Sequence, residues 1–260
     1  MRRLFLFLLV AAGSLLISSC LTIEERVTLN ADGSGTQVNT VDFSTLLENP
    51  MVKMGMAEEM KKNGNTDMTE RIDSSFRVLD NMLELNPQWT AEQRELLGRV
   101  TVDMVMDIEE GVGVVKTKFN FNDPGEIAEM NELMATANQP EGAQEANPFA
   151  SMSGQNFLAS VITLKGKKMV RETTTSPGFE NPMTEAGLDE ATMGMMQEMF
   201  GDAVIGYVVE FPGNIKKVKG FPGHEIEAGN ELRMVFDFME VMNDPDVVAK
   251  ALTGEVKFKK

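Results

Sequence analysis

Residues 99–122 alternate apolar and polar side chains with the two-residue period of a β-strand. The run RVTVDMVMDIEE is followed by Gly111 and then by VVKTKFNF, and in both runs apolar residues recur at every second position. Two such strands joined by a short turn predict an antiparallel hairpin. Because one of its faces is apolar and the other polar, we expect the sheet that contains it to be covered on one side only.

Similar patterns predict strands elsewhere in the chain. Residues 23–43 and 156–175 are typical of hairpins, and the first contains Asp-Gly-Ser-Gly where a tight turn needs positive φ angles. Further strands are expected over 203–212, over 215–220 and on both sides of a turn at Gly229.

Helical patterns separate these strands. A helix is expected to begin near Pro50, and Thr90 begins a capping-box sequence that predicts a short helix. Asp123-Pro124 and Asn243-Asp244-Pro245 are typical helix starts, and a Met-rich helix is expected near residues 188–201. Hairpins interleaved with helices predict an α+β fold, in which an antiparallel β-sheet built from hairpins has helices packed on one face.

Composition divides the chain into four parts. Residues 1–19 read as a signal peptide, and residues 20–136 as the N-terminal part of the α+β domain. Residues 137–155 are rich in Ala, Asn, Gln, Pro and Gly and have no periodicity, so we expect a flexible loop or linker there. Residues 156–260 form the C-terminal part of the same domain.

Cys20 is the only cysteine in the chain. It follows two arginines, an apolar run and two serines, and Ile17-Ser18-Ser19-Cys20 resembles the lipobox of bacterial lipoproteins. The resemblance implies that residues 1–19 are removed and that Cys20 is acylated, with palmitate among the acyl chains, which would hold the protein on a membrane. An apolar stretch of roughly 14 residues is short for a membrane span of about 20 residues, which disfavours an uncleaved transmembrane anchor.

The rest of the composition excludes several kinds of function. A formal net charge of −16 disfavours nucleic acid as a partner. With Cys20 acylated, no thiol is left for a disulfide or a metal site, and His224 is the only histidine, in a Pro/Gly turn. No nucleophile motif accompanies it. We therefore expect no catalytic residues, no metal and no cofactor, and interpret the protein as a non-enzyme.

Methionine is abundant, with 21 residues in the chain. Three interpretations stay open: an ordinary core, a pliable apolar cavity, and a Cu(I) site made of thioethers. The positions of the methionines on apolar faces favour the core, and copper is the least favoured because such sites commonly add His or Cys. The candidates for lining a cavity lie in one predicted helix: Met193, Met195, Met196 and Met199.

Positive charge gathers in short lysine runs within the less acidic part of the chain, residues 161–260. Edge strands and hairpin tips often carry lysine to prevent aggregation, and this is the simpler interpretation. The alternative is contact with anionic lipid or polysaccharide headgroups. The runs hold Lys165, Lys167 and Lys168 with Arg171 close by, then Lys216, Lys217 and Lys219, then Lys257, Lys259 and Lys260.

Two segments resemble LppM-like bacterial lipoproteins. They are CLTIEERVTLNADGSGT, which begins at Cys20, and the Phe-Pro-Gly-Asn-Ile sequence that begins at Phe211. The resemblance implies an α+β envelope protein with a lipid-binding cavity, and it assigns no catalytic residue. Leu21, directly after the cysteine, resembles a signal for sorting to the outer membrane, on its periplasmic or its surface face.

Three functional hypotheses follow. The leading one is a non-enzymatic envelope lipoprotein that binds an apolar or amphiphilic ligand, or an envelope partner protein. The second is a structural or assembly lipoprotein of an envelope complex. The third is a hydrolase whose carboxylates are dispersed along the sequence.

Overall fold

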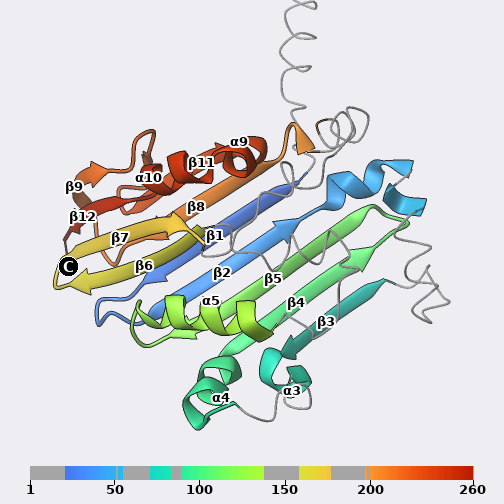
Figure 1. The fold of residues 1–260 in the computed structure, drawn as a ribbon, viewed down its shortest axis with the longest axis horizontal. Coiled ribbons are helices and arrows are strands. Elements are labelled where there is room, and N and C mark those ends of the chain that lie inside the picture. The colour runs from blue at the N-terminus through green and yellow to red at the C-terminus, as the bar shows by residue number, and fades with distance from the viewer. Residues whose placement is uncertain are drawn as a thin grey trace, which may run out of the picture.

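A computed structural model describes residues 21–50, 52–54, 71–82, 89–137, 158–176, 197 and 200–259. Its strands form two sheets (Figure 1). The large sheet has eight strands in the order β10-β11-β8-β1-β2-β5-β4-β3, and the small sheet has four in the order β6-β7-β12-β9. None of the helices among the described residues is long and apolar enough to cross a membrane.

The three hairpins expected from alternation are confirmed. β1 (Thr22–Leu29) pairs with β2 (Gly35–Asp42), and β4 (Val100–Asp107) pairs with β5 (Val112–Phe121). β6 (Leu158–Lys165) pairs with β7 (Lys168–Thr175). All three are antiparallel, and their turns contain Gly33, Gly111 and Gly166 at positive φ angles.

The expectation of one antiparallel sheet is wrong in two respects. β8 (Val204–Glu210) lies parallel to β1, with Ile23 opposite Ile205. β12 (Gly254–Phe258) joins β7 to β9 (Ile215–Gly220) and so completes a second sheet. Strands far apart in sequence make these pairs, and no turn between them sets their direction.

The remaining strands extend the large sheet at its two edges. β11 (Glu231–Asp237) and the short β10 (Glu225–Glu227) follow β8, as the sequence predicted around Gly229. At the other edge lies β3 (Ile72–Arg77), which the sequence did not predict because its IDSSFR run holds only two apolar residues. The broad α+β class is confirmed.

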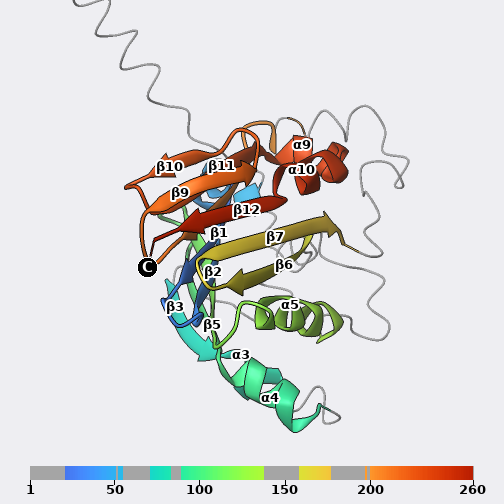
Figure 2. The same cartoon turned by 90° about the vertical axis from the view of Figure 1, so that its left-hand side faces the viewer.

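The small sheet lies on one side of the large sheet, and α5 (Glu126–Ala137) lies on that same side (Figure 2). We call this side of the large sheet its inner face. Side chains from both sheets form the main core, including the tilted ring pair of Phe211 and Phe258 at 5.1 Å. The packing of all the helices on one face stays a prediction.

Several expected helices are present within the described residues. Thr90 caps α4 (Ala91–Gly98) in a full capping box with Gln93, and Asp244 caps α10 (Pro245–Ala251). The region near Pro50 holds η1 (Ser44–Glu48) and helical residues 52–54. The structure also contains α3 (Val78–Met82) and α9 (Phe238–Asn243). Most of the predicted loop 137–155 and nearly all of the Met-rich helix lie outside the described residues.

Ala228, in the turn between β10 and β11, is exposed and has a φ of 48°. A left-handed backbone costs an L-residue roughly 1–2 kcal/mol and costs glycine little. We therefore expect Ala228→Gly to raise the free energy of unfolding by about 1 kcal/mol in urea titrations. Ala128→Gly, in the first turn of α5, is the matched control and is expected to lower it by up to about 1 kcal/mol. A loss of stability in both variants would contradict this interpretation of the turn.

Candidate functional site

Cys20 and the candidate cavity residues Met193, Met195, Met196 and Met199 lie outside the described residues. Their roles stay predictions. Methionines elsewhere occupy two environments. Met234 and Met242 are buried in the core, whereas Met104 and Met106 of β4 are only half-buried.

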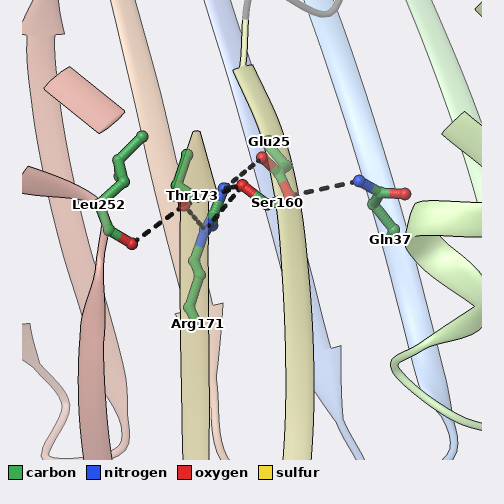
Figure 3. A network of polar contacts seen from close by, with 6 residues as sticks. All are labelled: Glu25, Gln37, Ser160, Arg171, Thr173 and Leu252. Atoms are coloured by element: carbon green, nitrogen blue, oxygen red, sulfur yellow. Dashed lines mark hydrogen bonds and ion pairs between the residues drawn. The ribbon is translucent and has the colours of Figure 1, made fainter. Parts of the chain in front are cut away.

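Arg171 does not belong to a basic surface run, contrary to the grouping made from the sequence. Its side chain is 1% exposed and lies between the two sheets (Figure 3). Its Nη2 donates to Glu25 Oε2 of the large sheet at 3.1 Å and to Ser160 Oγ at 3.0 Å. The physical reason is the strand period: Arg171 is three residues from Lys168, so the two side chains point to opposite faces of β7.

Further contacts surround the guanidinium group of Arg171. Its Nε donates to Ser160 Oγ and to Thr173 Oγ1, at 3.2 and 3.3 Å. Its guanidinium carbon lies 5.1 Å from the ring centroid of Tyr207. We call Arg171, Glu25, Ser160, Thr173 and Tyr207 the buried arginine cluster. Gln37 Nε2 extends it by donating to Glu25 Oε1 at 3.3 Å.

The chemistry of the buried arginine cluster suits a structural role, which is to hold the two sheets together. Burial raises the pKa of Tyr207, the negative charge of Glu25 adds to the effect, and Arg171 opposes it, so the phenol stays protonated. The guanidinium is permanently charged, and its carboxylate partner lies on the opposite sheet. The cluster therefore ties β7 to β1.

A second feature is an apolar area on the inner face of the large sheet, beyond the part that the small sheet covers. The register places Val102 of β4 opposite Phe76 of β3 and opposite Thr117 of β5, in the row that also holds Glu25. Val102 packs against the core, whereas Phe76 is 36% exposed. We call this area the inner strip; its residues are Ile72, Phe76, Val102, Met104, Met106 and Val115.

Phe43 borders the inner strip where the chain leaves β2. Its ring lies over Gly113 of β5, where a Cβ atom would come within 2.3 Å of the ring. Ser44 Oγ accepts a hydrogen bond from the Gly113 amide at 3.0 Å. The small residue at 113 therefore lets η1 pack against the end of β5.

The third feature is a set of lysines that strand pairing brings together on the outer face of the small sheet. Lys165 is opposite Lys168, Lys168 is opposite Lys257, and Lys257 is opposite Lys217. We call these four residues the lysine row. Lys219 lies in the next outward-facing row, opposite Glu255. Lys167 is exposed in the β6–β7 turn, and Lys216 is exposed beside the register shift of β9.

A hollow of about 690 Å³ lies between α4 and α5, and half of the residues that line it are glutamates. Arg99 bridges it, donating to both carboxylate oxygens of Glu126 at 2.7 and 3.0 Å. The hydrogen bonds from Arg99 are the main reason that the pKa of Glu126 lies below its ordinary value. Within the described residues, no group of three His, Cys, Asp or Glu side chains is arranged to hold a metal ion.

His224 lies in the turn after β9, as expected. Its Nδ1 is 2.7 Å from the carbonyl oxygen of Phe221, so a contact within the turn accounts for its position.

Removal of one partner from the buried arginine cluster leaves a charge without its counterion. We expect Arg171→Met to lower the free energy of unfolding by about 3 kcal/mol, because Glu25 then loses its cation. The double variant Arg171→Met with Glu25→Gln should recover part of that loss in a double-mutant cycle measured by urea unfolding. The control is Arg77→Met, whose exposed ion pair with Asp80 should contribute less than about 1 kcal/mol. Equal losses in the two single arginine variants would contradict the role of the cluster.

No protein-family model matches the chain. No curated protein matches it either. Among solved structures, it is similar to the NMR structure of the folded domain of the Mycobacterium tuberculosis LppM protein, with a TM-score of 0.41 and 9% sequence identity. That match covers 93% of this chain and 91% of the other. A likeness of this size establishes neither the family nor the function of the chain.

Proposed function

We propose that this protein is a non-enzymatic lipoprotein of the cell envelope, which binds the apolar part of an amphiphilic ligand on the inner strip. The proposed anchor is the lipid on Cys20, and the proposed location is the outer membrane. No cofactor and no catalytic residue take part.

The observation that carries this proposal is the incomplete burial of the inner strip. In an antiparallel sheet the apolar face normally packs against a second layer. Here Ile72, Met104, Met106 and Val115 point to the inner face and are only half-buried. Unbranched methionine side chains adapt to varied apolar shapes, which suits a ligand with acyl chains.

The start of the fold supports the anchor. Leu21 is 3% exposed, and its carbonyl oxygen accepts a hydrogen bond from the Val204 amide at 3.0 Å. Leu21, the residue directly after Cys20 in the sequence, is therefore already held in the large sheet. Acyl chains on Cys20 would hold this end of the sheet close to the headgroup layer.

Loss of Cys20 tests the anchor. We expect the full chain, expressed in a bacterium, to incorporate a palmitate analogue and to sediment with membranes. Cys20→Ala should abolish the label, because no second cysteine exists to accept a thioether-linked lipid. Ser19→Ala, which keeps a small residue before the cysteine, is the control and should keep the label. A labelled Cys20→Ala chain would contradict the proposal.

Polar substitutions in the inner strip test the ligand site. Met104→Gln should reduce the lipid that co-purifies with the protein about fivefold, a factor that corresponds to about 1 kcal/mol of lost apolar contact. The measurement is mass spectrometry of lipids extracted from the purified protein. Val105→Gln, on the outer face of the same strand, should leave the amount unchanged. Purified wild-type protein without lipid, or equal losses in both variants, would contradict binding on the inner strip and favour an assembly role.

A further inference from the structure

The lysine row crosses all four strands of the small sheet. Each of its residues is directly opposite the next, from Lys165 on β6 through Lys168 and Lys257 to Lys217 on β9. Adjacent strands are about 4.8 Å apart, so the row spans about 14 Å. The neighbouring residues Met169 and Val256 are 0% exposed on the core side, which places the row on the outer face.

Protection against aggregation would explain the two lysines on edge strands but not the two on inner strands. Lysine on an edge strand discourages pairing with another chain, and β6 and β9 are the edges of the small sheet. Lys168 and Lys257 lie on the two inner strands, which already have partners on both sides. Like charges directly opposite each other also weaken a sheet. Apart from the partly exposed ion pair between Lys168 and Glu255, the fold gains nothing evident from this single-sign row.

The charge of the row is only partly neutralised within the protein. Lys168 Nζ lies 2.8 Å from Glu255 Oε2. The hydrogen bond from Lys168, together with the charges of Lys168, Lys219 and Lys257, lowers the pKa of Glu255. The other outward carboxylate on the strands of the small sheet, Glu172 of β7, lies opposite Val161, two outward-facing rows from Lys168. The lysines outnumber the carboxylates at this end of the sheet.

The row and the start of the domain lie at opposite ends of β1. A Cβ atom on Gly33, in the β1–β2 turn, would lie 3.7 Å from Leu164 Cδ2, beside the row. The two ends of β1, Thr22 and Leu29, are about 23 Å apart at 3.3 Å per residue, and Leu21 directly precedes Thr22. Contact of both ends with one membrane would lay the domain along the surface.

We propose that the lysine row contacts phosphate-bearing lipid headgroups of the membrane that carries the anchor, and so sets the orientation of the domain. This inference rests on the proposed lipid anchor. Lysine ammonium groups on flexible stems suit diffuse attraction to an anionic lipid surface, which adds up over several residues. An anchored domain needs only weak extra attraction, because its local concentration at the membrane is already high.

Lysine labelling of the full chain tests the row. The protein is reconstituted into vesicles of phosphatidylcholine alone, or of phosphatidylcholine and phosphatidylglycerol in equal amounts, and labelled with a membrane-impermeant amine reagent. We expect labelling of the row to fall about fivefold on the anionic vesicles, and the protection to disappear at high salt. Lys116 and Lys118, exposed on the outer face of β5, are the internal controls and should be labelled equally on both vesicles.

Substitutions distinguish specific contact of the row with the membrane from general adsorption of the protein to the vesicles. In the triple variant that combines Lys165→Gln, Lys168→Gln and Lys257→Gln, anionic vesicles should no longer protect the neighbouring Lys219 from labelling. The matched double variant Lys116→Gln with Lys118→Gln should keep this protection. The triple variant removes like-charge pairs but also the ion pair of Lys168 with Glu255, and these two effects oppose each other, so it should melt within a few degrees of the wild type. A larger drop in melting temperature would overturn the view that the fold gains little from the row.

Two further results would overturn the inference. One is equal labelling of the row on neutral and anionic vesicles. The other is protection by a soluble polyanion such as heparin without protection by anionic vesicles, which would assign the row to an acidic polysaccharide. An intact mass without lipid would contradict the anchor instead. The unlipidated chain, mixed with the same two kinds of vesicle, would then still show whether anionic vesicles protect the row.

Discussion

The pairing of Arg171 with Glu25 across the interface is the buried polar interaction that constrains how the two sheets lie against each other. A guanidinium that is 1% exposed is costly to desolvate, and its cost is offset only when its hydrogen bonds and its counterion are in place. Ser160 and Thr173 lie on the small sheet, and Glu25 and Tyr207 lie on the large one. Sliding of one sheet over the other would separate these groups.

The stacking of the two sheets leaves two different surfaces. The small sheet has four strands and the large sheet eight, so the small sheet leaves part of the inner face without its cover. The inner strip of β3, β4 and β5 is accordingly half-buried. On β7, an inward Arg171 requires an outward Lys168, because side chains alternate along a strand. Burial of one cation therefore determines that the other faces solvent.

Local patterns predicted much of the fold and little of the candidate sites. Alternation predicted the β4–β5 hairpin, and the Thr90 capping box predicted α4, because each depends on neighbours in sequence. β3 escaped prediction because its run holds few apolar residues, and the parallel β1–β8 pair because no turn joins the two strands. The alternation of side chains along β7 could have predicted that Arg171 and Lys168 point to opposite faces. Nothing in the sequence aligned Lys257 with either lysine run.

By itself, the sequence determined the hairpins, their turns, the helix caps and the only residue that can carry a thioether-linked lipid, Cys20. These features follow from backbone preferences and side-chain chemistry within a few residues. Tertiary structure decided that the strands divide into two sheets, that Arg171 is buried, and that four lysines from three separate segments share one row. Those outcomes depend on which distant strands pair and in what register, and that choice is made by the packing of the whole core.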